Sequence, residues 1–221
     1  MFLGYNEDMK KSLSLCFLGP QGCGKGTQVA LLQQDYGYHV LGMGQALRDL
    51  AAEDSPLGMQ VKAIHDQGTL VPNEITIEIL RRELAKLNQG QGIILDGFPR
   101  NMGQAETLAT ILPLNAAVEF DITAKVAVER LLQRLMCPKG HIYNLQSNPP
   151  KQAAICNLDG LTLHRRDDDT EEAIKQRLEI YYQETAKVLD YYRSQGKLIT
   201  INGDQPIADV YQHLLVELNK L

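Results

Sequence analysis

Gly19-Pro-Gln-Gly-Cys-Gly-Lys-Gly-Thr27 directly follows the apolar run Leu13-Ser-Leu-Cys-Phe-Leu18. This order predicts a buried strand, a glycine-rich loop and the start of a helix. Glycines let the backbone curl until several N–H groups converge on one anion, and the N-terminus of the next helix adds partial positive charge. The stretch therefore predicts a phosphate-binding loop. The alternative is a glycine-rich turn that binds nothing.

Side chains of this loop indicate nucleotide chemistry. Lys25 supplies a mobile positive charge for the outer phosphates of a nucleotide, and Thr27 offers a hydroxyl that can ligate Mg²⁺. Cys23 lies between two glycines, and we expect it to contribute its backbone N–H and not its thiol.

The composition of the chain excludes several classes of protein. Its 221 residues carry a net charge of −5, which argues against a mainly electrostatic nucleic-acid binder. No apolar stretch approaches the length of a membrane span. Residues 1–11 lack the apolar stretch of a signal peptide, and we expect them to form a flexible extension. Four scattered cysteines are too few for a disulfide scaffold, which favours a reducing cytoplasm.

Short apolar runs alternate with longer segments of helical periodicity, which predicts an α/β fold with a five-stranded parallel sheet flanked by helices. The predicted strands are Leu13–Leu18, Tyr38–Leu41, Gly92–Leu95, Ala117–Ile122 and Leu198–Ile201. The predicted helices are Thr27–Asp35, Pro72–Leu87, Gln104–Ile111, Ala124–Leu135, Thr170–Ser194 and Ile207–Leu218. Asp169 is the predicted N-cap of the helix that follows it, with Glu172 completing a capping box.

Ile93-Ile-Leu-Asp-Gly-Phe-Pro-Arg100 is the second segment with chemical content. Asp96 ends an apolar strand predicted to lie beside the phosphate loop, where a carboxylate can hold Mg²⁺ through water. A cap for the next turn is the alternative. Arg100 follows the rigid Pro99, which would aim its planar guanidinium at a phosphate.

Taken together, the motifs resemble the adenylate kinases, within the nucleoside monophosphate kinase family. The phosphate loop GPQGCGKGTQ, the segment LDGFPR, the downstream Gln104, the stretch YNLQSNPPK and the run RDDDTEEAIKQRL follow the order of the bacterial, long-lid form. The resemblance covers almost the whole chain after Lys11. It implies a P-loop kinase that transfers a phosphoryl group reversibly from Mg²⁺-ATP to AMP, giving two ADP. A kinase with broader or pyrimidine monophosphate preference is the alternative.

Six arginines lie at positions that match the family: Arg48, Arg100, Arg130, Arg134, Arg166 and Arg177. Arg48 and Arg100 match positions that hold the AMP phosphate. Arg130 lies four residues before Arg134, so we expect both on one helix face. The resemblance implies that Arg130 packs over the ATP adenine. A solvated charged face explains any single arginine, but not six at matching positions.

The resemblance implies three sets of site residues. The implied catalytic residues are Lys25, Arg100, Arg134, Arg166 and Arg177. The implied ATP contacts are Gly22, Cys23, Gly24, Lys25, Gly26, Thr27, Arg130, Arg134, Ile142, Tyr143 and Gln205. The implied AMP contacts are Met43, Arg48, Thr69, Leu70, Val71, Gly97, Phe98, Pro99, Arg100, Gln104, Arg166 and Arg177. For Tyr143, packing within the lid is the alternative.

Base selection is where the chain departs from the family. The Gln104 amide offers a donor and an acceptor, which suit the edge of an adenine and favour AMP. Met43 stands where the family usually has a threonine facing the AMP base, and methionine can pack against a purine. Thr69 and Asn73 replace the usual lysine and aspartate, which weakens the expectation of strict AMP preference.

A metal site in the lid is an open question. Cys156-Asn-Leu-Asp159 matches the second half of the family's zinc knuckle, but Cys137 is out of register with the first half. Cys137 and His141 could still complete a tetrahedral zinc site with Cys156 and Asp159, because these are acceptable zinc ligands. The favoured alternative is a metal-free lid closed by hydrogen bonds.

The resemblance also implies the domain organisation. We expect a core of residues 12–41, 72–132 and 170–221, an NMP-binding insertion at 42–71 and a lid at 133–169. The break in periodicity from Met136 to Asp168 fits such a lid. Closure of both pieces over two nucleotides would expel water. The expected partners are ATP and AMP, with no nucleic acid or membrane, and the expected state is a monomer.

Overall fold

A parallel sheet with β1 (Ser14–Leu18) at its centre organises the fold. The computed structural model describes residues 12–66, 69–166 and 169–221; the predicted N-terminal extension lies outside them. The strand order is β2-β3-β1-β4-β7, and every neighbouring pair is parallel. The other strands are β2 (His39–Gly42), β3 (Ile93–Asp96), β4 (Ala116–Asp121) and β7 (Leu198–Asn202). The predicted five-stranded α/β sheet is confirmed.

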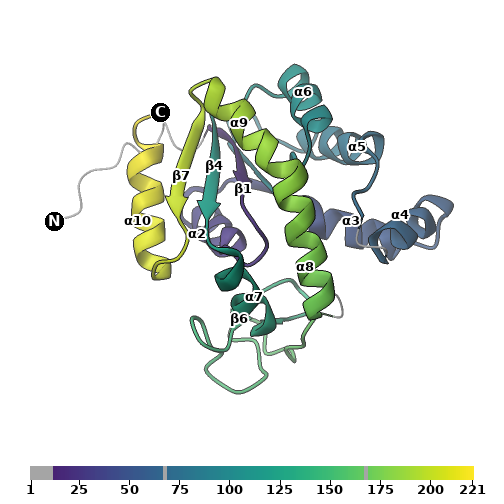
Figure 1. The fold of residues 1–221 in the computed structure, drawn as a ribbon, viewed down its shortest axis with the longest axis vertical. Helices are drawn as coiled ribbons and strands as arrows, with labels where there is room; N and C mark the ends of the chain where they lie inside the picture. The colour runs from purple at the N-terminus through teal and green to yellow at the C-terminus, as the bar shows by residue number, and fades with distance from the viewer. Residues whose placement is uncertain (1–11, 67–68, 167–168) are drawn as a thin grey trace.

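Helices cover both faces of this sheet (Figure 1). Successive β1 residues alternate between two apolar clusters, because side chains alternate across a strand: Leu15 and Phe17 lie in one, Cys16 and Leu18 in the other. The first cluster includes residues of α2 (Lys25–Tyr36), α7 (Ala124–Leu132), α8 (Glu171–Ile180) and α10 (Ile207–Leu218). The second includes residues of α5 (Asn73–Leu84), α6 (Met102–Ile111) and α9 (Ala186–Ser194).

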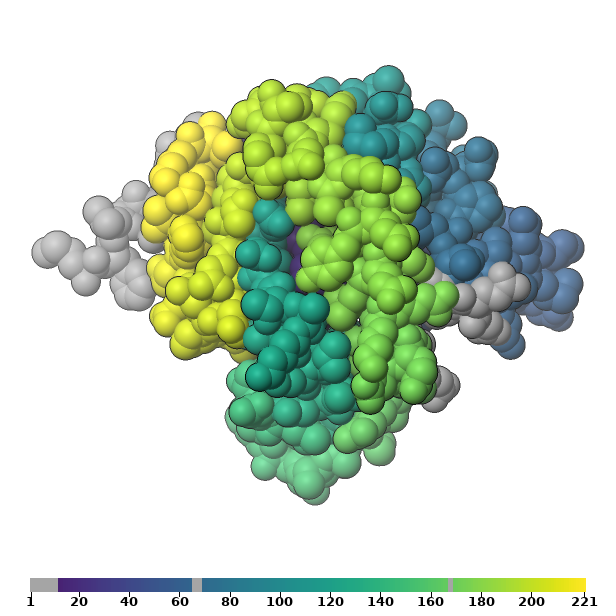
Figure 2. Space-filling model, viewed as in Figure 1, coloured from purple at the N-terminus to yellow at the C-terminus, as the bar shows by residue number. Residues whose placement is uncertain are grey.

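Two segments project from this body. One contains α3 (Met43–Ala51) and α4 (Pro56–Asp66), two helices within the predicted insertion. The other contains the antiparallel pair of β5 (Arg134–Met136) and β6 (Ile142–Asn144), followed by turns. Figure 2 shows the two segments, in blue and in green, on separate sides of the molecule.

Two local predictions were wrong. The helix predicted over Ala124–Leu135 ends at Leu132, because Arg134 pairs with Asn144 in the lid hairpin. Arg130 and Arg134 therefore do not share a helix face. The N-cap of α8 is Thr170, whose side chain accepts from the Ala173 N–H, and not Asp169.

The predicted Thr170–Ser194 helix is interrupted by one π-helical segment, η1 (Tyr181–Thr185), between α8 and α9. This wider turn places the Thr185 hydroxyl 2.9 Å from the Arg100 carbonyl, to which it donates. Among the described residues, no helix has the length and apolarity needed to cross a membrane.

Candidate active site

The phosphate loop lies between the carboxyl end of β1 and the start of α2. Gly19 (φ 140°) and Gly22 (φ 85°) have backbone angles that favour glycine, and a Cβ there would lie 2.5 Å from the Phe120 oxygen and 2.9 Å from the Ala127 oxygen. No other residue fits either position without displacing the backbone behind it. The loop thus wraps closely against the sheet, with the N-terminus of α2 above it.

Lys25 folds back over this loop. Its ammonium donates to the carbonyls of Gly19 (2.7 Å) and Pro20 (3.0 Å) and lies 3.2 Å from the Cys23 sulfur. The thiol of Cys23, expected to be uninvolved, is thus part of the ammonium's surroundings. Thr27 and Gly26 begin α2, and Ile142 of the lid lies 3.4 Å from where a Gly26 Cβ would be.

The segment after β3 carries the next charges. Asp96 ends β3, directly beside Phe17 of β1 in the sheet register. Burial raises the pKa of Asp96, and the positive charges of Lys25, Arg100 and Arg48 lower it in part. Three cations therefore surround one carboxylate at the carboxyl end of β3.

Arg100 and Arg48 point to the same place. Arg100 is anchored by a 2.8 Å bond from its Nε to the Gly97 carbonyl. A Cβ on Gly44 would lie 3.4 Å from Arg48 Nη1 and 3.8 Å from Arg100 Nη2. Arg48 also donates to Gln45 Oε1 at 2.6 Å. Two guanidiniums thus converge at a glycine that leaves space between them.

Asp169 joins two more of the predicted arginines. Arg134 donates to it through Nε (2.9 Å) and Nη2 (2.6 Å), and Arg177 through Nη2 (2.9 Å). The Asp169 side chain is only 3% exposed. The sequence did not predict that Asp169 would bind these two arginines, although Asp169 lies in the charged run that contains Arg166.

The arginines form one electrostatic cluster. Burial lowers the pKa of Arg100; Asp96 opposes this, and Arg177 and Arg166 add to it. Burial also lowers the pKa of Arg134, against the hydrogen bond with Asp169. A polyanion would relieve this concentration of positive charge.

The predicted adenine side of the ATP site includes the loop after β7. Arg130 donates to the Gly203 carbonyl (2.9 Å) and to Asp204 (3.1 Å). A Cβ on Gly203 would lie 2.9 Å from the Cys23 oxygen, so this loop lies against the phosphate loop. Gln205 follows it and is exposed.

Tyr143 lies elsewhere, buried in the lid. It is 5% exposed; its hydroxyl accepts from the Asn157 N–H at 2.8 Å and lies 3.4 Å from the Cys156 sulfur. This placement favours packing over nucleotide contact for Tyr143.

The predicted AMP side is largely apolar. Met43, Val71, Phe98 and Pro99 are buried, and the first three lie in the second core cluster. Thr69 is exposed and donates to the Ile64 carbonyl at 3.3 Å, and Leu70 next to it is half-buried. Gln104, 2% exposed, is a buried polar residue of this region.

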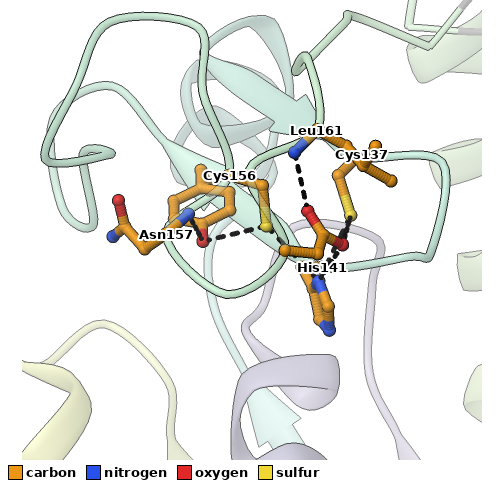
Figure 3. Close-up of polar contacts among 7 residues, drawn as sticks. Cys137, His141, Cys156, Asn157 and Leu161 are labelled. Carbon is orange, nitrogen blue, oxygen red and sulfur yellow. Dashed lines mark hydrogen bonds and ion pairs between the residues drawn. The ribbon is translucent and has the colours of Figure 1, made fainter.

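Four potential metal ligands meet in the lid, and three of them, Cys137, His141 and Cys156, are labelled in Figure 3. Ligand atoms of Cys137, His141, Cys156 and Asp159 all lie within 4.8 Å of one another. His141 Nδ1 is 3.2 Å from Cys137 Sγ, 3.4 Å from Cys156 Sγ and 3.1 Å from Asp159 Oδ2. The Gly140 N–H donates to the Cys137 carbonyl at 2.9 Å and closes a tight turn. This turn compensates for the position of Cys137, which is out of register with the first half of the family's zinc knuckle.

Protonation in this cluster follows from its contacts. Hydrogen bonds from the Cys156 thiol and the Leu161 N–H lower the pKa of Asp159 to about 2. Burial raises the pKa of Cys137. An ionised Asp159 carboxylate therefore lies beside the Cys137 thiol in this cluster.

The fold and the site define the class of protein. A phosphate loop at the carboxyl edge of a parallel sheet, facing an arginine cluster and a buried carboxylate, is the arrangement of a P-loop phosphotransferase. Residues 17–197 match the family model described as adenylate kinase. The chain belongs to the adenylate kinase family, as the motifs predicted.

Individual relatives align with this chain over nearly their whole length. The adenylate kinase of Bacillus subtilis strain 168 is 40% identical over 205 residues, which cover 90% of this chain and 94% of the relative. That of Methanosarcina barkeri strain Fusaro is 36% identical over 213 residues, with 94% and 99% coverage. That of Thermotoga neapolitana is 40% identical over 208 residues, with 91% and 94% coverage.

Proposed function

We propose that this protein transfers the terminal phosphoryl group of Mg²⁺-ATP to AMP, giving two ADP, with the substrates held between the phosphate loop and the arginine cluster. Arg48 and Arg100 converge at Gly44, whereas Lys25 bonds to the carbonyls of its own loop, and this arrangement carries the proposal. A hydrolase or switch needs one phosphate site, whereas two sets of cations suit two nucleotides. The comparisons give no support to a pyrimidine-preferring kinase.

The proposed roles follow from charge and position. Lys25 leaves its loop carbonyls to neutralise the outer ATP phosphates, and Arg48 and Arg100 hold the AMP phosphate. Arg134, Arg166 and Arg177 offset charge on the group in transfer. The remaining proposed contacts are those of the loop residues Gly22 to Thr27, Arg130, Ile142 and Gln205 to ATP, and those of Met43, Thr69 to Val71, Gly97 to Pro99 and Gln104 to AMP.

Thr27 and Asp96 are the proposed holders of Mg²⁺. A hydroxyl and a carboxylate are oxygen ligands that this ion prefers, and a nearby cation would favour the ionised form of the buried Asp96. The ion would supply charge neutralisation between phosphates.

We also propose that the lid holds a structural zinc ion. Tetrahedral zinc with Zn–S near ~2.3 Å and Zn–N or Zn–O near ~2.0–2.1 Å requires neighbouring ligand atoms about 3.3–3.8 Å apart, the longest separation being between the two sulfurs. Four of the ligand-atom pairs are 3.1–3.4 Å apart, close to this requirement. The donor set Cys137, His141, Cys156 and Asp159 therefore fits the ion.

The two projecting segments are proposed to close over the substrates. Residues 42–71 would cover AMP and residues 133–169 ATP, excluding water that would otherwise accept the phosphoryl group. The four unpaired cysteines fit the proposed cytoplasmic location. We propose that the protein acts as a monomer.

A coupled assay tests the proposal. ATP is offered with AMP, UMP, CMP or GMP in turn, and AMP is expected to give the highest kcat/KM. Calorimetry should then show two nucleotide sites per chain. A preference for UMP or CMP, or a single site, would contradict the proposal.

A further inference from the structure

A chain of hydrogen bonds holds the Gln104 amide on both sides. The Thr76 hydroxyl donates to the Asn73 carbonyl (2.9 Å) and lies 3.2 Å from Gln104 Nε2. The Arg100 backbone N–H donates to Gln104 Oε1 at 2.7 Å. Gln104 is 2% and Thr76 3% exposed, so water does not compete for these bonds.

Both ends of this chain are backbone groups with one role each. A carbonyl can only accept, so the Thr76 hydroxyl hydrogen is used by Asn73 and its oxygen must accept from Gln104. A backbone N–H can only donate, so the amide atom that faces Arg100 must be oxygen. A flipped amide would set two donors against each other at Arg100 and two acceptors at Thr76. The amide therefore has one orientation.

The elements that carry the chain are locked together. Asn101 caps α6 by accepting from the Gln104 N–H (2.9 Å), and its Nδ2 donates to Asn73 Oδ1 at the start of α5 (3.0 Å). A Cβ on Gly103 would lie 2.8 Å from Asn73 Nδ2, so a side chain there would displace the Asn73 amide. The hydrogen bonds between the starts of α5 and α6 thus hold Thr76 in a fixed position relative to Gln104.

A fixed orientation selects the base. The two bonds use one donor and one acceptor position of the amide and leave one of each. Adenine presents an amino donor at C6 beside an acceptor N1, whereas a 6-oxopurine presents the reverse order. Met43, 1% exposed, offers no hydrogen-bond donor, so polar selection falls to this amide.

We propose that Thr76 is a positioning residue that fixes the Gln104 amide, so that the monophosphate site accepts a 6-aminopurine nucleotide and rejects a 6-oxopurine one. This inference rests on the proposed function, which places the AMP base at Gln104. Because Gln104 is covered in this structure, the base reaches it only after the covering side chains move.

The test compares AMP with IMP, whose bases differ at the 6-position. Thr76→Val keeps the shape and removes the acceptor. We expect the ratio of kcat/KM for AMP to that for IMP to fall by about tenfold, mainly through KM for the monophosphate, with KM for ATP unchanged. Thr76→Ser should restore the ratio. Thr76→Ala serves as a second variant if the valine destabilises the fold.

The outcomes separate the two proposals. If Gln104→Met leaves the AMP to IMP ratio unchanged, the base is not read by Gln104, and its placement in the proposed function fails. If Gln104→Met abolishes the preference but Thr76→Val and Thr76→Ala do not alter it, only the positioning role is overturned. Loss of the ratio in Thr76→Ser as well would also overturn it, because the hydroxyl would then not be the cause.

Discussion

The guanidinium of Arg134 forms a bidentate ion pair with Asp169, through bonds of 2.9 and 2.6 Å. This pair joins β5 to the segment that leads into α8. The carboxylate is shared with Arg177, whose Nη2 donates to the same oxygen, Oδ1, as Arg134 Nη2. One buried anion thus spaces two cations before any phosphate arrives.

Replacing this anion should disturb both arginines. We expect Asp169→Asn to lower kcat by on the order of 10²-fold, since misplaced catalytic groups have effects of this size. The free energy of unfolding should fall by about 1–3 kcal/mol, because charge-assisted hydrogen bonds are lost. Steady-state kinetics and urea denaturation measure both. Glu172→Gln, an exposed acid of the same segment, is the matched control and should change neither quantity.

Lys25→Met should reduce transfer to background while leaving the fold intact. Within the described part of the chain, the ammonium bonds to loop carbonyls and the nearby sulfur, and these contacts do not hold the core together. A loss of at least ~10²–10³-fold in kcat is expected for removal of a charge that acts on the transition state. The exposed Lys187→Met is the control. A fully active Lys25→Met enzyme would contradict the assignment.

Arg100→Ala should weaken the monophosphate side selectively. Arg100 is anchored beside Gly97 and converges with Arg48 at Gly44, whereas Lys25 bonds to the carbonyls of its own loop. We expect KM for AMP to rise by on the order of tenfold or more, since a charge-assisted bond is lost, with a smaller change in KM for ATP. Arg82→Ala, exposed on α5, serves as the control. Equal changes in both KM values would argue against separate sites.

The lid cluster predicts a stoichiometric metal. Protein purified without added zinc should contain about one zinc per chain by elemental analysis, as expected of a closed four-ligand site. Cys137→Ser should lose the metal and lower the melting temperature, whereas Cys16→Ser should retain the metal because Cys16 is in the core, outside this cluster. A molar ratio near zero in the wild type would remove the zinc proposal.

Glu83 should give stability an acid dependence. Its hydrogen bonds with Lys86 and, 3.1 Å away, His39 lower its pKa, although burial opposes them. Since the folded pKa is below the unfolded one, this stabilisation is present above the glutamate range and is lost as the pH falls from about 5. Unfolding free energy measured between about pH 5 and 3 should decline less steeply in Glu83→Gln, by less than about 1 kcal/mol in total. A decline in Glu83→Gln as steep as that of the wild type would contradict this role of Glu83.

The sheet could be predicted from local pattern, but the site only in part. Buried strands such as Ile93–Asp96 are apolar runs, and the phosphate loop is contiguous, so both are visible in the sequence. The pairing of Arg134 was not visible in the sequence, because its partner in the hairpin, Asn144, lies ten residues away. This pairing ends the helix at Leu132. Asp169 reads as a helix cap, and only the folded chain brings Arg134 and Arg177 to it. Likewise, nothing near Thr76 in sequence predicts its bond to Gln104.

The lid has a very small apolar interior. Its cluster consists of Cys137, Tyr143, Cys156 and Leu163, with Leu135 packed against them, whereas the two clusters on the sheet are far larger. So little buried surface cannot offset the entropy of ordering a segment of this length. We therefore expect the lid to be a separate cooperative unit whose order depends on the polar side chains of Cys137, His141, Cys156 and Asp159. It can unfold locally and refold, with fast amide exchange, while the sheet beneath the phosphate loop stays protected.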